Sequence, residues 1–144
     1  MATQAQLVLT SDVSGDPTNV DTGLVTLTKA GGTNELDQTT GVGRVHLRST
    51  TEKLLLASNT NGNDLASKVY IINKSEDASL YVTVKINART IGKLYGGDFM
   101  FIPWSQTDPA ADIKVAATNL TSSTGDIPVE YVLFHEDTDY LADA

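Results

Sequence analysis

The sequence predicts an all-β protein, built as a single antiparallel β-sandwich or jelly-roll-like domain, with or without an extended N-terminal arm. Three observations support this fold class. Apolar and polar residues alternate with a period of two at many places between residues 68 and 134, as in half-buried strands. Turn-forming residues separate these short segments. No segment has the three-to-four residue spacing of an amphipathic helix. The clearest alternation places four side chains on one face of a strand: Leu80, Val82, Val84 and Ile86.

Four strands are expected in the first half of the chain, at residues 6–10, 24–29, 43–48 and 53–57. No aromatic residue precedes Tyr70, so these strands must pack through aliphatic side chains alone. Two interpretations follow: an arm that orders only against a partner, or strands that complete one sandwich with the second half. We favour completion, because an antiparallel sheet needs its apolar face covered.

Five strands are expected in the second half, at residues 68–73, 80–87, 98–102, 113–118 and 127–134. The polar segment 73–77 is short enough to join the first two as a hairpin. A chain of 144 residues fits one domain. We expect that domain to comprise aliphatic strands or an arm in residues 1–66, an aromatic-rich core in 67–136 and an acidic tail in 137–144.

Charge and composition argue against several classes of partner. The net charge is -8 and the pI is near 4.5, whereas a phosphate-binding surface needs clustered Lys and Arg. With no cysteine, the chain cannot form a disulfide or a thiolate metal site. No signal-like or membrane-spanning apolar stretch is present, so we expect a soluble protein made in a cytoplasm, with neither nucleic acid nor membrane as partner.

Residue types that carry chemistry are sparse, and we expect no enzyme, no cofactor and no metal site. The two histidines, His46 and His135, have no third ligand at a metal-like interval. No GxSxG elbow is present. A glycosidase needs a pair of carboxylates, and four residues could supply it: Asp98, Asp112, Glu130 and Glu136. Acidic residues on the polar face of a strand are usually solvated rather than catalytic, so hydrolysis is disfavoured.

Residues 59–64 (Asn-Thr-Asn-Gly-Asn-Asp) resemble a calcium loop, because oxygen-bearing side chains surround a glycine. The glycine stands fourth rather than sixth. Tyr70 also occupies the twelfth position, where the bidentate glutamate belongs. A plain turn is therefore the favoured interpretation.

The segment 96–104 carries the largest concentration of apolar side chains. Alternation puts Phe99, Phe101 and Pro103 on one face and Met100, Ile102 and Trp104 on the other. Such a strand lies either between two layers or at an interface. As an interface it would use aromatic and Met anchors, with the polar loop 105–111 as a rim. The candidate interface residues are Tyr95, Phe99, Met100 and Trp104.

Three stretches together resemble a type of small virion structural protein of tailed bacteriophages: VYIIN at 69–73, IGKLYGGDF at 91–99 with IPW at 102–104, and PVEYVLF at 128–134. The resemblance covers about half of the chain. It implies a β-sandwich that decorates or cements the capsid as a homotrimer, with the major capsid protein as its partner. Its location would be the capsid surface of the virion, after assembly in the host cytoplasm.

Two other functions stay open from the sequence. In a tail, neck or fibre component, Trp104, Tyr95 and Tyr81 would be exposed near one another and would bind a host glycan. In a small hydrolase, Asp98, Glu130 or His135 would be essential.

Overall fold

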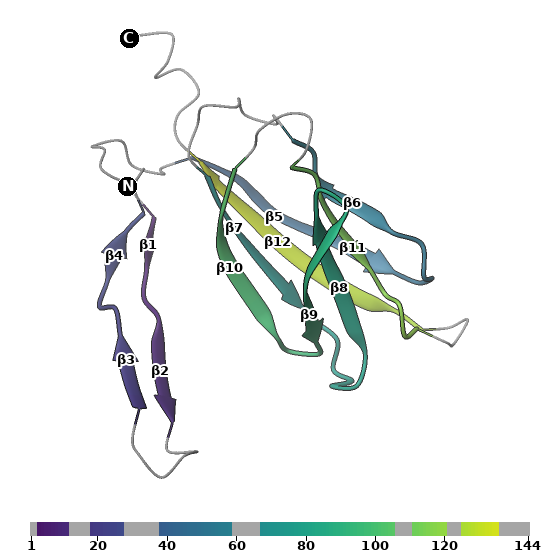
Figure 1. Ribbon diagram of the computed structural model, residues 1–144, viewed down its shortest axis with the longest axis horizontal. Coiled ribbons are helices and arrows are strands. Elements are labelled where there is room, and N and C mark those ends of the chain that lie inside the picture. Colours follow the sequence, from purple (N-terminus) through teal and green to yellow (C-terminus); the bar gives the residue numbers. More distant parts are fainter. Residues whose placement is uncertain are drawn as a thin grey trace, which may run out of the picture.

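Two four-stranded antiparallel sheets face each other and form a sandwich, and a separate β-hairpin stands beside it (Figure 1). The computed structural model describes residues 3–11, 18–27, 38–58, 67–105, 111–120 and 125–135. All regular structure in these ranges is β-strand. The predicted all-β sandwich is therefore confirmed.

The first sheet has the strand order β10-β7-β12-β5, and the second has the order β6-β11-β8-β9. The first comprises β5 (Gln38–Leu47), β7 (Ser67–Asn73), β10 (Phe99–Trp104) and β12 (Ile127–His135). The second comprises β6 (Lys53–Leu56), β8 (Tyr81–Ile86), β9 (Arg89–Tyr95) and β11 (Ile113–Ala116). The chain changes sheet at every connection except β8 to β9. This order over eight strands is that of a jelly roll.

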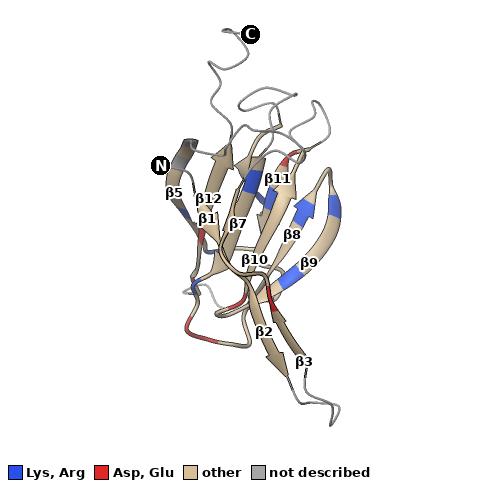
Figure 2. Ribbon diagram, turned by 90° about the vertical axis from the view of Figure 1, so that its left-hand side faces the viewer, with Lys and Arg blue, Asp and Glu red and all other residues tan. Residues whose placement is uncertain are grey.

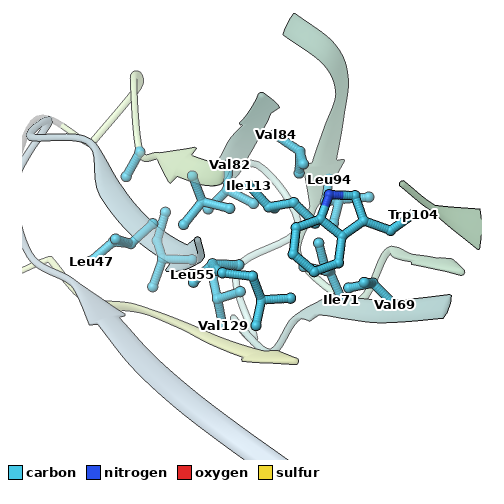
Figure 3. Close-up of a cluster of buried hydrophobic side chains, with 14 of the residues drawn as sticks. Leu47, Leu55, Val69, Ile71, Val82, Val84, Leu94, Trp104, Ile113 and Val129 are labelled. Atoms are coloured by element: carbon cyan, nitrogen blue, oxygen red, sulfur yellow. The ribbon is translucent and has the colours of Figure 1, made fainter. Parts of the chain in front are cut away.

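The core is a mainly aliphatic layer between the two sheets, with Trp104 as its aromatic member (Figure 3). In β7 every second residue is buried, and Val69 and Ile71 point into this layer. Full burial of each such side chain contributes about 1.5–3 kcal/mol. The largest fully buried side chains come from both sheets and include the following: Leu47, Val69, Ile71, Val82, Val84, Ile113, Val115, Ile127 and Leu133.

Close packing leaves no room for a side chain at Gly43. Gly43 in β5 pairs with Tyr131 in β12, and the Tyr131 ring covers it. A Cβ atom at Gly43 would lie 2.5 Å from a ring carbon of Tyr131, so any side chain there would force the ring to move.

The hairpin is formed by β1 (Gln4–Ala5), β2 (Val8–Ser11), β3 (Thr18–Asp21) and β4 (Val25–Thr26). Strand β2 pairs with β3, and β1 pairs with β4. The register shifts between the two ladders at Gly23, whose φ of 65° suits glycine. None of these strands belongs to a sheet of the sandwich. Strands β5 and β6 thus complete the sandwich, whereas strands β1 to β4 do not.

The hairpin predicted across residues 73–77 is wrong, because β7 and β8 lie in opposite sheets. The tight hairpin joins β8 to β9 instead, and its turn residues Asn87 and Ala88 have φ of 53° and 60°. Positive φ at both central positions is what a type I′ turn needs. The sequence prediction also omitted β1, β3 and β9.

Asn73 makes the crossing between sheets possible at the end of β7. Its buried side-chain amide donates hydrogen bonds to the carbonyl oxygens of Leu80 (3.2 Å) and Leu94 (2.9 Å). Its side-chain oxygen accepts a bond from the Ser75 amide at 2.9 Å. Through one side chain, the first sheet is tied to the residue that precedes β8 and to strand β9. A buried amide with three partners is satisfied rather than costly.

We predict that Asn73→Ala lowers the free energy of unfolding by about 3 kcal/mol, because buried backbone groups lose their partners. Urea unfolding measures the change. Asn119→Ala is the matched control, since Asn119 also bonds two backbone groups, the amide of Tyr81 and the carbonyl of Ser79, yet lies nearer to solvent. Equal losses in the two variants would contradict the role given to Asn73.

Candidate interaction surfaces

Strand β10 is an edge strand of the first sheet, and its two faces have different surroundings. Trp104 is 4% exposed, and its indole nitrogen donates a hydrogen bond to the Ala111 carbonyl at 2.8 Å. Met100 is half-buried against the core on the same face. Phe99 and Phe101 point outward and are 58% and 38% exposed. The predicted alternation of this strand is therefore present.

The four candidate interface residues do not form one surface. Trp104 is part of the core, and Met100 packs against that core. Phe99 lies on the outer side of the first sheet, while Tyr95 ends β9 in the second sheet. Only Phe99 and Tyr95 are exposed.

The outer side of the first sheet carries a continuous row of apolar side chains across all four strands. Strand register places Phe101 beside Tyr70, Tyr70 beside Val132, and Val132 beside Val42. We call the following residues the outer apolar face: Val42, Tyr70, Ile72, Phe99, Phe101, Val132 and Phe134. They are exposed or half-buried, and the rings of Tyr70 and Phe99 have centroids 6.0 Å apart.

Charged residues within this face are mainly basic. Arg44 Nε donates a hydrogen bond to Glu130 at 3.1 Å, and this bond is the main cause that lowers the pKa of Glu130. Lys68 pairs in register with Phe134 and Pro103 on the same side of the sheet. The four-strand surface therefore combines apolar area with two cations, Arg44 and Lys68, and one carboxylate.

The hairpin has an apolar and a polar face. Register puts Leu9 opposite Val20 and Ala5 opposite Val25. Leu9 is 52% exposed and Val20 is 43% exposed. We call the following residues the hairpin apolar face: Ala5, Leu7, Leu9, Val20 and Val25.

The polar face of the hairpin is organised around Asp21. Gln6 donates a side-chain hydrogen bond to Asp21 at 2.9 Å, and the Gly23 amide donates another at 2.8 Å. These two bonds lower the pKa of Asp21. Thr10 and Asn19 lie opposite each other on the same ladder. Val8, the register partner of Asp21, is 55% exposed on this face, so the hairpin is polar on this side apart from one valine.

A third surface lies on the outer side of the second sheet. Tyr81 and Tyr95 are register partners, with ring centroids 5.2 Å apart and planes tilted by 52°. Lys93 Nζ lies 4.7 Å from the centre of the Tyr81 ring. Trp104 is in the core, so the three aromatic side chains expected together for glycan binding do not meet.

Three of the four candidate catalytic carboxylates lie among the described residues, and each of these has a local structural partner. Asp98 accepts a hydrogen bond from the Tyr95 amide at 3.0 Å, and Asp112 accepts one from the Ser58 amide at 2.7 Å. The bond from Ser58 is the main cause that lowers the pKa of Asp112. Glu130 pairs with Arg44. Each of these carboxylates therefore has a role in the fold that needs no catalytic function.

The two histidines lie apart in the structure. His46 Nδ1 lies 3.0 Å from Asp126, at the surface, and His135 is buried in β12. Among the described residues, no group of three or more metal-ligating side chains comes together, and no helix could span a membrane. The calcium-like segment 59–64, the loop centre 106–110, Glu136 and the tail 137–144 lie outside the described residues.

No protein-family model and no curated protein sequence matches this chain.

We predict acid-sensitive stability from the Glu52 ion pairs. Glu52 lies 3.0 Å from Lys85 and 3.7 Å from Lys114, and the hydrogen bond from Lys85 is the main cause that lowers its pKa. A carboxyl with a lowered folded-state pKa binds its proton more tightly when unfolded. Its stabilisation is therefore complete above the ordinary value of 4.5 and is lost as the pH falls through the folded-state pKa.

Urea midpoints of the wild type and of Glu52→Gln, measured from pH 7 to pH 3, check this expectation. The difference between the two proteins should be largest at pH 7 and should shrink on acidification. A difference that is independent of pH would contradict it. Because both lysines are partly exposed, the whole effect should be small and should weaken in salt.

Proposed function

We propose that this protein is a non-enzymatic structural protein of a tailed-phage virion, a capsid decoration protein that binds the outside of the head and stabilises the lattice. One observation supports an adhesive role: a sandwich whose core is complete still presents a row of apolar side chains across four strands. Monomeric soluble proteins rarely leave large contiguous apolar surfaces in water. The resemblance at residues 69–73, 91–99, 102–104 and 128–134 supports the phage head as the setting.

The stabilising mechanism would be mass action. A protein that binds the assembled lattice but not its dissociated subunits shifts the equilibrium toward the lattice, by about 2.7 kcal/mol per site at one hundred times its dissociation constant. The many copies on a head multiply this gain. Such a role needs surface area and shape, and it requires no nucleophile, metal or cofactor.

A reconstruction of the source particle tests this proposal. Density for the sandwich, anchored by Tyr70, Trp104 and Tyr131, is expected on the head at three-fold or local three-fold positions beside the major capsid protein. Density on the tail, or no density on any particle, would overturn the decoration role.

The Tyr81–Tyr95 pair favours a second candidate, a tail, neck or fibre component that binds host glycans. Two tilted aromatic rings beside a lysine offer an apolar surface with a polar edge, which suits stacking against a sugar.

For this candidate, Tyr95→Ala should reduce glycan-array binding at least about tenfold, whereas Phe99→Ala, on the opposite sheet, should leave it unchanged. The absence of any glycan signal from the wild type would exclude the second candidate.

A further inference from the structure

The hairpin lacks a core of its own. A two-stranded hairpin is at best marginally stable in water unless its apolar face packs against something. Here the ladder is nonetheless continuous: the Thr22 amide donates to the Leu7 carbonyl at 3.0 Å, and the Leu27 amide donates to the Thr3 carbonyl at 2.9 Å. A hairpin whose backbone hydrogen bonds are formed but whose aliphatic face is exposed is expected to pack that face against another surface.

The outer apolar face matches the hairpin in chemistry. In both surfaces, residues paired in register on neighbouring strands form rows of aliphatic or aromatic side chains. The two segments also have net charges of opposite sign. Residues 3–27 contain three aspartates, of which Asp21 lies on the polar face of the hairpin, and no Lys, Arg or His, whereas the sheet carries Arg44 and Lys68 against the single carboxylate of Glu130.

The hairpin does not cover the sheet of its own chain. Figure 1 shows it standing apart from the sandwich, and Figure 2, seen from the hairpin side, shows β2 and β3 extending past the first sheet. Both surfaces remain exposed in the single chain, since Leu9 and Phe99 are more than half exposed. Each surface is therefore free to meet its counterpart on another copy.

We propose that the hairpin apolar face of one copy docks on the outer apolar face of a second copy. Every copy then gives one hairpin and receives one, so the exchange can close into a symmetric oligomer. This inference goes beyond the proposed function, because it identifies a partner and a contact without reference to any particle.

Cross-linking tests the contact directly, because the natural chain has no cysteine. Two differently tagged single-cysteine chains, Leu9→Cys and Phe101→Cys, are mixed and treated with a short bismaleimide. The expected product is a heterodimer that joins the two tags. Asn19→Cys is the matched control, because Asn19 lies on the polar face of the same hairpin and should give far less product.

The oligomeric state gives an independent measurement. Light scattering of the full wild-type chain should yield a multiple of its 15.3 kDa mass. Leu9→Asp should raise the dissociation constant at least about tenfold, because a carboxylate would be buried in an apolar contact. Thr10→Asp, one residue away on the polar face, should associate like the wild type.

Three results would overturn the inference: a monomeric wild type, an oligomer unaffected by Leu9→Asp, or a doubly substituted Leu9→Cys/Phe101→Cys chain that links only within itself. Unfolding curves show whether each variant keeps its sandwich, which lies outside the hairpin. A monomer that still decorates heads would contradict the exchange alone. An oligomer with the expected cross-link that is absent from heads would contradict the proposed function alone.

Discussion

The constraint on which the rest of this structure depends is that the first sheet is apolar on both faces, while a two-layer sandwich can bury only one of them. The inner face, with Val69 and Ile71, closes against the second sheet and provides the core. The outer face keeps Phe99 and Phe101 in water. Stability and adhesion thus come from opposite sides of the same strands. In this account, substitutions on the inner face change folding and those on the outer face change association.

The jelly-roll connections depend on polar groups at the points where the chain leaves one sheet for the other. Asn73 satisfies carbonyl oxygens of the second sheet from the end of a strand in the first. Ser67, at the other end of β7, donates its hydroxyl to the Trp104 carbonyl at 2.7 Å and holds the edge strand in place. These bonds are buried, so each adds specificity to the strand order at little cost.

The sequence predicted the fold class and most strands because strict alternation is a local signal. Strands β7, β8 and β12 were located to within a residue or so. Strand β3, with the sequence Thr-Asn-Val-Asp, has no such alternation, and β9 buries little beyond Leu94, so both were missed.

The polar segment 73–77 could not show whether the chain makes a tight turn within one sheet or crosses to the other sheet. The outcome depends on hydrogen bonds from Asn73 to residues distant in sequence. Alternation also placed Phe99 and Trp104 on opposite faces of β10. It could not show which of the two faces the second sheet covers, because that depends on pairing between strands distant in sequence. The hairpin apolar face could have been predicted from the sequence, because Ala5, Leu7 and Leu9 recur at every second position and would lie on one face of a strand.

The central claim is that the hairpin and the outer apolar face are surfaces for association rather than parts of a finished monomer. Hydrogen exchange of the full chain, measured at low and high protein concentration, tests it most directly. Backbone amides of β2 and β3 should gain protection as concentration rises, while amides of the core strand β7 stay equally protected throughout. Hairpin amides whose exchange is the same at every concentration would contradict the claim.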